Sequence, residues 1–491
     1  MTQPPALPRA MSRRTALTTL AASALVPVAS RLAAAAGDAS LHHDIARRAR
    51  ALTAGQKINL QLLLPEGSRA NVTPVIAQFL AMTGVHVTFT ESSLEEINTQ
   101  LTLDALSNTH TYDLALPATF GVPDLVASKA ILPLSKFVAK HEPEGFRDDI
   151  LYQVGDSFDG ETYGFQTDGD AYVMFYNKAM LKNPTERARY ADQYGVELEK
   201  PLTWQELDRQ MAFFNRPEQG QWGGLLFRSL GHVAWEWWVR FHAKGVWPFS
   251  PDMEPQITSS EGISALEDMI RSSESLCPEA AHVGVFQNWE RYSRGDVYCN
   301  IGWGGSQKYF NSAGSGMRGN MVYGPTPGGM LEGELLITPY FNWGWNYVVA
   351  SNSAFPELAY LFALFASTPE MSTLAVRQKD GFFDPFRPEH YDDIGIKSAY
   401  SEEFLAVHRA SLEASIPDLY LKNQGAYFRI LSEWISRALS GEVSPQEAME
   451  RVAQTWQVIT SGAGRPLQIK RWEQLRAKYP ARIRRVLRDL S

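Results

Sequence analysis

The first third of the chain alternates short apolar runs with longer segments in which apolar residues recur at helical spacing. The short runs predict strands and the longer segments predict helices, in chain order, at 57–64, 73–82, 85–90, 94–107 and 112–116. Strands that alternate with helices indicate a parallel α/β sheet. Ligands of such sheets bind beyond the carboxyl ends of the strands, which makes Glu66, Ser68 and Phe120 candidate site residues.

A polar loop interrupts the apolar pattern near the middle of the chain. Residues 159–181 read DGETYGFQTDGDAYVMFYNKAML, which predicts a turn, a strand, a polar loop and a second strand. Asp168 and Asp170 lie on the loop, where two carboxylates can point into a cleft and accept hydrogen bonds. The alternative is that both residues only shape a surface turn, as aspartate often does.

Tryptophan is abundant and concentrates between Trp204 and Trp345. Trp303 follows a predicted strand on a glycine-rich loop, and Trp343 and Trp345 flank a glycine at the start of another strand. Trp235 belongs to an aromatic stripe on a predicted helix, a pattern that more often packs in a core than contacts a ligand. Core packing is also the alternative to ligand contact for the other indoles.

Composition narrows the class of protein. A chain of 491 residues allows two to three domains, and a hydrophobic content of 44% is ordinary for a globular protein with a core. The formal net charge of -8 argues against nucleic-acid binding, which needs a basic face. The two cysteines, Cys277 and Cys299, leave open either one disulfide or two separate buried thiols.

The N-terminal 36 residues have the pattern of an export signal. Arg13 and Arg14 precede a mildly apolar run at 15–30, and small residues follow at 33–36. The arginine pair indicates the twin-arginine route, although Ala16 stands where that motif favours Phe. The run is too short and too weakly apolar to span a bilayer, which needs about 20 residues. We therefore expect a cleaved signal at 1–36 and a soluble, periplasmic mature protein.

Motifs of common enzyme families are missing from the sequence. There is no GxSxG, no HExxH, no nucleotide fingerprint and no Cys–His pair. His232 and His242 lack a third ligand at suitable spacing, and we expect neither a metal nor a cofactor. The paired acids leave open a secreted glycoside hydrolase, whose two carboxylates need a particular separation.

The remaining candidate residues suit a ligand rich in hydroxyl groups. A sugar offers an apolar C–H face, which a flat indole covers at low entropic cost, and hydroxyls that donate to carboxylates. Trp303, Trp343, Trp345, Asp168 and Asp170 supply both kinds of group from loops at strand ends. The same residues could also form an aromatic and acidic cage for a polyamine or another cation, so that reading stays open.

The order of several short motifs resembles that of the family 1 extracellular solute-binding proteins, the carbohydrate-capturing subunits of ABC importers. The resemblance runs from 57 to 459 and rests on the segments 122–134, 159–181, 201–207, 295–305, 323–330, 342–350 and 381–387. In 342–345, which reads NWGW, one glycine of the family's pattern is replaced, which leaves open which of the two tryptophans faces the cleft.

The resemblance implies a fold, a function and a partner. The fold is two α/β lobes of the type II, maltose-binding-protein-like kind, joined by a hinge, with the ligand in the cleft between them. It places 57–165 and parts of 340–400 in the first lobe, 166–339 and 400–460 in the second lobe and hinge, and 461–491 in a tail. It adds Phe383 to the ligand-binding candidates and implies a monomer that delivers a sugar or polyol to ABC transporter permease subunits.

Overall fold

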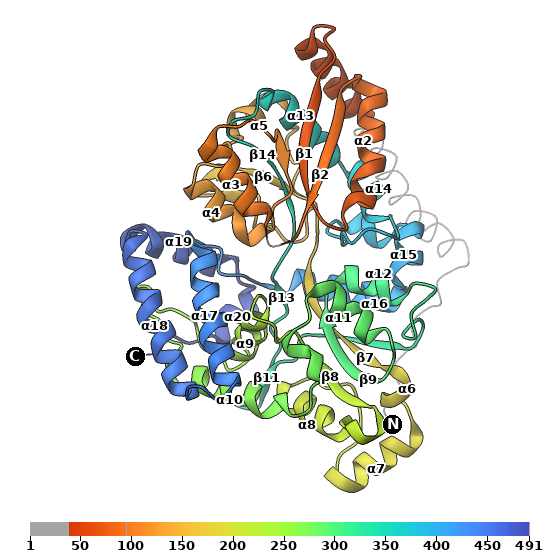
Figure 1. Cartoon of the computed structure of the whole chain (residues 1–491), viewed down its shortest axis with the longest axis vertical. Helices are drawn as coiled ribbons and strands as arrows, with labels where there is room; N and C mark the ends of the chain where they lie inside the picture. Colours follow the sequence, from red (N-terminus) through yellow and green to blue (C-terminus); the bar gives the residue numbers. More distant parts are fainter. Residues whose placement is uncertain (1–38, 95, 491) are drawn as a thin grey trace, which may run out of the picture.

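The protein consists of two α/β lobes, one above the other in Figure 1, each built on its own sheet. The computed structural model describes residues 39–94 and 96–490, so the predicted signal at 1–36 lies outside the described residues. The predicted two-lobe α/β fold is confirmed. In the described part of the chain, none of the helices combines the length and apolar character that a membrane crossing requires.

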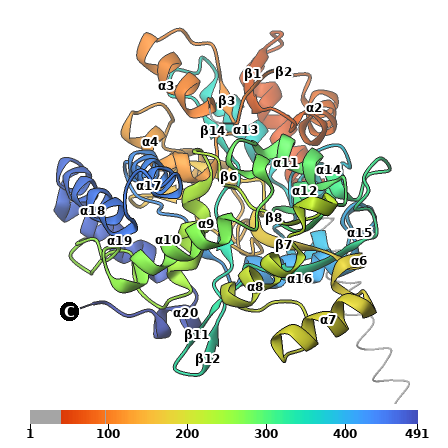
Figure 2. The ribbon, with the colours of Figure 1, turned by 60° about the horizontal axis from the view of Figure 1, so that its bottom comes forward.

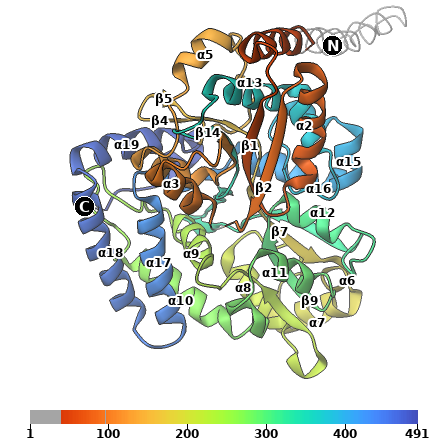
Figure 3. The same cartoon turned by 45° about the horizontal axis from the view of Figure 1, so that its top comes forward.

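The sheet of the first lobe has the strand order β2-β1-β3-β14-β6, with β1, β2 and β3 parallel and β14 antiparallel to both of its neighbours. Its strands are β1 (Asn59–Pro65), β2 (His86–Ser92), β3 (Leu114–Ala115), β6 (Gly164–Gln166) and β14 (Asn346–Val349). Helices α3 and α4 lie on one side of it, and α2 and α14 on the other (Figures 1 and 3). The predicted alternation of strand and helix is thus present in the order expected.

The first lobe has short hairpin strands and several helices. They are β4 (Ser157–Phe158), β5 (Glu161–Thr162), α2 (Arg69–Thr83), α3 (Ile97–Ser107), η1 (Thr119–Gly121), α4 (Val122–Ala127), α5 (Ser135–His141), α13 (Pro356–Ala366) and α14 (Pro369–Val376). Residues 39–53 form a further helix.

The sheet of the second lobe has the order β15-β13-β7-β9-β8, and β10 pairs with β7. Its strands are β7 (Ala171–Asn177), β8 (Trp222–Leu225), β9 (Val297–Gly302), β10 (Met321–Pro325), β13 (Tyr340–Phe341) and β15 (Ile416–Pro417). Two further strands, β11 (Gly329–Leu331) and β12 (Glu334–Leu336), form a hairpin at the edge of the lobe, next to α20 in Figure 2.

Helices surround the second sheet and extend into a C-terminal bundle. They are α6 (Lys178–Leu181), α7 (Pro184–Tyr194), α8 (Trp204–Phe214), η2 (Pro217–Gln219), α9 (Val233–His242), α10 (Ser260–Ser273), η3 (Pro278–Ala281), α11 (Val285–Tyr292), α12 (Gly304–Phe310), η4 (Pro388–Tyr391), α15 (Ile394–Tyr400), α16 (Glu402–Glu413), α17 (Gln424–Leu439), α18 (Pro445–Gly462), α19 (Arg465–Lys478) and α20 (Ala481–Val486). The segment beyond residue 461 is therefore helical, and Trp472 anchors it because its indole is fully buried and donates to the carbonyl of Ser250.

Three chain segments connect the lobes. Residues 166–171 lead from β6 to β7, residues 341–346 lead from β13 to β14, and the loop after α14 leads back to α15. The predicted arrangement of strand, polar loop and strand around Asp168 and Asp170 is confirmed, and its two strands pair into different sheets. The polar loop is consequently the point where the chain crosses from one lobe to the other.

Local sequence rules explain several element ends. Thr203 accepts from the backbone N–H of Glu206 while the Glu206 carboxylate accepts from that of Thr203, which is a capping box at the start of α8. The expected glycine-rich loop after β9 is instead the first turn of α12, whose N-cap is Trp303. Cys277 and Cys299 are separate, buried free thiols.

Candidate functional site

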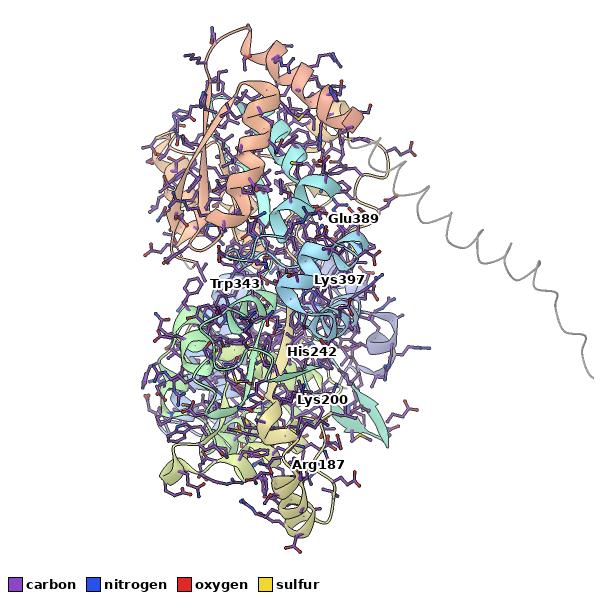
Figure 4. All side chains as sticks on the ribbon, turned by 90° about the vertical axis from the view of Figure 1, so that its right-hand side faces the viewer. Arg187, Lys200, His242, Trp343, Glu389 and Lys397 are labelled. Atoms are coloured by element: carbon purple, nitrogen blue, oxygen red, sulfur yellow. The ribbon has the colours of Figure 1, made fainter. Side chains whose placement is uncertain are left out.

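A narrow pocket lies between the lobes and is walled almost entirely by aromatic and aliphatic side chains. Its free volume is about 30 Å³, close to that of a single water molecule. The first lobe and the connecting segments contribute Leu94, Asp170, Trp343, Trp345 and Phe382, and the second lobe contributes Val285, Phe286, Trp289, Trp303 and Gly305. Asp170 is the acidic member of this lining. Figure 4 places Trp343 at the level where the two lobes meet.

Indole rings meet edge to face at the back of the pocket. The ring centroids of Trp303 and Trp343 are 5.5 Å apart with planes at 88°, and that of Trp235 lies 5.1 Å from that of Trp343. Phe120, from the first lobe, adds its ring 5.9 Å from that of Trp343. Such edge-to-face packing holds each ring in a defined orientation, which presets the pocket wall.

Hydrogen bonds of the backbone and side chains fix the indoles. The Trp303 indole N–H donates to Oδ1 of Asn342 over 2.8 Å. Gly344 has φ +66, and its N–H donates to Oδ2 of Asp170 over 3.0 Å. A side chain at position 344 would approach the ring of Phe341 to 2.5 Å, so this tight turn between the two tryptophans requires glycine.

Two residues of the pocket wall have an indole N–H group without a hydrogen-bond partner in the described residues. They are Trp289 and Trp343, and both nitrogens are shielded from solvent. A buried donor without an acceptor costs about 1–3 kcal/mol, so such groups favour a ligand that offers oxygen acceptors. Together with the carboxylate of Asp170, the pocket therefore offers both donors and an acceptor among its aromatic faces.

Three carboxyl groups converge beneath the pocket, where the lobes are connected. Oxygens of Asp168, Asp170 and Asp384 lie within 4.8 Å of one another, and all three side chains are buried. The backbone N–H of Asp384 donates to Oδ1 of Asp168 over 2.7 Å, and that of Gly304 donates to Oδ2 of Asp384 over 2.6 Å. We call these three residues the carboxyl triad.

Burial and mutual repulsion shift the titration of the triad. Desolvation, followed by the nearby Asp384 charge, raises the pKa of Asp168 well above its usual value. Desolvation and the charges of its two neighbours do the same to the pKa of Asp170. Burial raises the pKa of Asp384 to about 6. The rise stays moderate because the charge of Lys308 and hydrogen-bond donors of the chain lower the pKa and offset part of the desolvation.

Lys308 supplies a buried positive charge next to the triad. Its ammonium donates to the carbonyls of Val376, Gln378 and Phe383, over 2.9, 2.9 and 3.1 Å. Desolvation lowers its pKa to about 8, although Asp384 and Asp168 act in the opposite direction. The spacing of the triad resembles that of a cation site, but most of its oxygens already accept from protein donors, and we assign it no metal.

The structure brings four of the predicted site residues together in the pocket: Asp170, Trp303, Trp343 and Trp345. Phe120 and Trp235 contact these indoles without lining the pocket, and Asp168 lies below them in the triad. Burial alone does not distinguish an indole that lines the pocket from one that packs in the core. Even the lining residues are nearly buried, since Trp303, Trp343 and Trp345 are only 4%, 6% and 2% exposed.

The other predicted residues lie beside the pocket. Glu66 is exposed, and the buried hydroxyl of Ser68 donates to the carbonyl of Pro65. The intervening Gly67 is the residue of this loop that packs against the rings of Phe382 and Phe286. Phe383 is buried next to the lining residue Phe382.

Several residues of the pocket and of the carboxyl triad's surroundings escaped the sequence analysis. Phe286 and Trp289 lie on α11, whose amphipathic pattern over eight residues does not differ from that of any packing helix. Phe382 and Asp384 belong to the third connecting loop, and Lys308 follows the glycines of α12. The available signal was the acidic residue Asp384 within 381–385, a segment that the family resemblance had already singled out.

Solved structures with the same fold belong to binding proteins of ABC transporters. An ABC transporter solute-binding protein from Agrobacterium radiobacter K84, in complex with ribitol, is 19% identical with a TM-score of 0.70, covering 82% of this chain and 98% of that one. A second, from Agrobacterium vitis S4 with bound D-mannitol, is 16% identical with a TM-score of 0.68, covering 83% and 99%. Maltose-bound MalE3 of T. maritima is 14% identical with a TM-score of 0.68, covering 82% and 100%.

A sequence family covers most of both lobes. The model of the bacterial extracellular solute-binding proteins matches residues 75–401, which is more than half of the chain. The match includes the pocket residues, the carboxyl triad and the three connecting segments. On this match, and with the two-lobe fold that the solved structures share, the chain belongs to the family of bacterial extracellular solute-binding proteins.

Proposed function

We propose that the protein captures a small sugar or polyol between its lobes and delivers it to the permease of an ABC transporter. The observation that carries this proposal is the chemistry of the pocket wall. Flat indole faces stand next to the carboxylate of Asp170 and the unpartnered indole N–H groups of Trp289 and Trp343. A hydroxyl group can donate to the carboxylate and accept from an indole, so a polyhydroxylated ligand satisfies both.

The same wall weighs against the polyamine alternative. A cage for cations uses aromatic faces and acids, but an ammonium group has only donors. It would leave the N–H groups of Trp289 and Trp343 without an acceptor. The ribitol, mannitol and maltose in the structural neighbours agree with a hydroxyl-rich ligand.

Capture requires the lobes to move. A free volume of about 30 Å³ is well below the several hundred Å³ that small-molecule pockets usually provide. Because three connecting segments join the lobes, they can open by rotation about these segments and close on the ligand. We assign the protein binding without chemical change, in line with the solute-binding family to which it belongs. It acts as a monomer outside the cytoplasm.

A ligand panel tests the proposal. Thermal unfolding of the mature protein is measured with ribitol, mannitol, tagatose, maltose and spermidine, and each hit is confirmed by isothermal titration calorimetry. Stabilisation by a sugar or polyol, with the ligand recovered unchanged, is the expected result. Stabilisation by spermidine alone would contradict the proposal, and a chemically altered sugar would point to a hydrolase.

A further inference from the structure

The carboxyl triad places more negative charge in one buried spot than its surroundings neutralise. Three carboxyl groups have oxygens within 4.8 Å of one another, and none of the three is more than 6% exposed. Fully ionised, they would carry three charges against the single ammonium of Lys308. Like-charged carboxylates at such distances do not all ionise in a low-dielectric environment, and one of them keeps a proton.

Among the residues that the structure describes, the groups around the triad offer no second positive charge. Tyr400, on α15, donates to Oδ1 of Asp384 over 3.0 Å. His408, on α16, has Nε2 3.8 Å from Oδ2 of Asp384, and burial lowers its pKa to about 4, so it is neutral near pH 7. Asp380, at the end of the α14 loop, adds negative charge near Lys308. Tyr391 bonds to the other nitrogen of His408 and is uncharged.

One member of the triad is also part of the ligand pocket. Asp170 lines the pocket, while its Oδ2 accepts from the backbone N–H of Gly344 in the connecting segment. A ligand hydroxyl that donates to Asp170 favours the ionised carboxylate over the protonated one. The proton that the triad shares and the ligand therefore compete for the same group.

We propose that the carboxyl triad holds one shared proton near neutral pH and that ligand capture releases it, which makes binding dependent on pH. This inference rests on the proposed function, because it takes the ligand hydroxyl as the competitor. Affinity then rises with pH through the titration of the triad, by up to about tenfold per pH unit for one released proton. An exported receptor of this kind loads poorly in acid and well at neutral pH.

Isothermal titration calorimetry of the ligand into the protein tests the coupling between ligand binding and proton release. Titrations of the strongest ligand of the panel at pH 6.5 in two buffers with different ionisation enthalpies give the number of protons released. We expect close to one proton for the wild type and a clearly smaller number for Asp168→Asn, which keeps the shape but removes one charge. Asp104→Asn is the control, because Asp104 is a buried acid outside the triad whose side chain bonds to Thr111 and Asn352 in the first lobe.

Unfolding without ligand tests the shared proton independently. A carboxyl group whose pKa is raised in the folded state stabilises the protein in acid. This stabilisation is lost as the pH rises through the folded-state pKa, which is about 6 for Asp384. Buried histidines such as His242 and His408 have lowered pKa values, so their contribution to stability rises with pH instead of falling. Because the wild type and the variant share these histidines, the difference between their curves isolates the triad. Between pH 5 and 8, Asp168→Asn is expected to lose less stability than the wild type.

The outcomes separate this inference from the proposed function. Equal proton release by wild type and Asp168→Asn, or parallel pH–stability curves, would overturn it. Stabilisation of the ligand-free wild type by Ca²⁺, Mn²⁺ or Zn²⁺ that disappears in Asp168→Asn would also overturn it, since the triad would then hold a metal. If no sugar or polyol binds, the proposed function fails, and the unfolding curves decide on the shared proton alone.

Discussion

Asp159 and Arg471 form a two-pronged ion pair that ties the first lobe to the C-terminal helix α19. The guanidinium donates to Oδ1 over 2.9 Å and to Oδ2 over 2.6 Å. Arg471 also lies over the ring of Phe158, 5.1 Å from its centroid. The hairpin β4–β5 of the first lobe therefore rests on a helix that otherwise packs with the second lobe (Figure 3).

Removal of this pair should cost little stability. Asp159 is 43% exposed, and pairs at such positions contribute about 0.2–1 kcal/mol. In a double-mutant cycle of Asp159→Asn and Arg471→Gln, urea unfolding should give a coupling energy in that range that shrinks with added salt. A coupling above about 2 kcal/mol would show that the pair is effectively buried.

Asp124 should matter more, because it links α4 of the first lobe to the start of α17. Its oxygens accept from the backbone N–H groups of Asn423 and Gly425 at the start of α17, over 2.5 and 3.1 Å. Asp124→Ala leaves these donors unpaired and should lower the free energy of unfolding by about 1–2 kcal/mol. Asp192→Ala, at an exposed position on α7, is the control and should change it by less than about 0.5 kcal/mol.

Gly344→Ala should destabilise the hinge. The substitution gives a residue with a side chain the backbone angle φ +66 and brings its Cβ within 2.5 Å of the Phe341 ring. Together these effects should lower the free energy of unfolding by roughly 2–4 kcal/mol. Gly333→Ala is a matched control, because Gly333 has φ +85 but no atom within 4 Å of its added carbon, so it should cost about 1 kcal/mol. Chemical unfolding measures both, and equal losses would refute the tight packing at position 344.

The indole N–H of Trp343 should bind the ligand directly. Trp343→Phe keeps a ring in the wall but removes the donor, so affinity should fall about fivefold, the value of one neutral hydrogen bond. Asp170→Asn should weaken binding roughly 10- to 100-fold, since it removes a charged acceptor. Trp434→Phe, on α17 away from the pocket, should leave the calorimetric Kd unchanged. Unchanged affinity in Trp343→Phe would remove Trp343 from the site.

Export should depend on the arginine pair at positions 13 and 14. Changing both arginines to lysine should retain the precursor in the cytoplasm, because the twin-arginine route requires the guanidinium pair. Cell fractionation followed by immunoblotting measures the exported fraction. Export at the wild-type level would assign the segment to the general secretory route instead.

Local rules made the elements predictable. The turn predicted at the start of 159–181 is the Asp159-Gly160 turn of the β4–β5 hairpin, because turns depend only on neighbouring residues. The capping box of Thr203 and Glu206 follows from an equally local rule. The polar loop around Asp168 and Asp170 was visible as a break between two apolar runs. The order of short motifs added the two-lobe fold, which none of them specifies alone.

Contacts between distant segments were not predictable in this way. Asp384 joins Asp168 and Asp170 only because three connecting segments meet between the lobes, and Trp289 reaches the pocket only because α11 faces the first lobe. Helical spacing and strand alternation specify which face of an element is apolar, not which other element covers it.

The sequence by itself determined the alternation of strands and helices, the position of the acidic crossover loop and the supply of indoles at strand ends, since these follow from neighbouring residues. The tertiary structure alone decided which indoles line the pocket, which nitrogens stay unpaired and which carboxyl groups share one buried site. The physical reason is that burial, repulsion and hydrogen bonding act through space, between residues that can be far apart in the chain, as Asp168 and Asp384 are, with 216 positions between them.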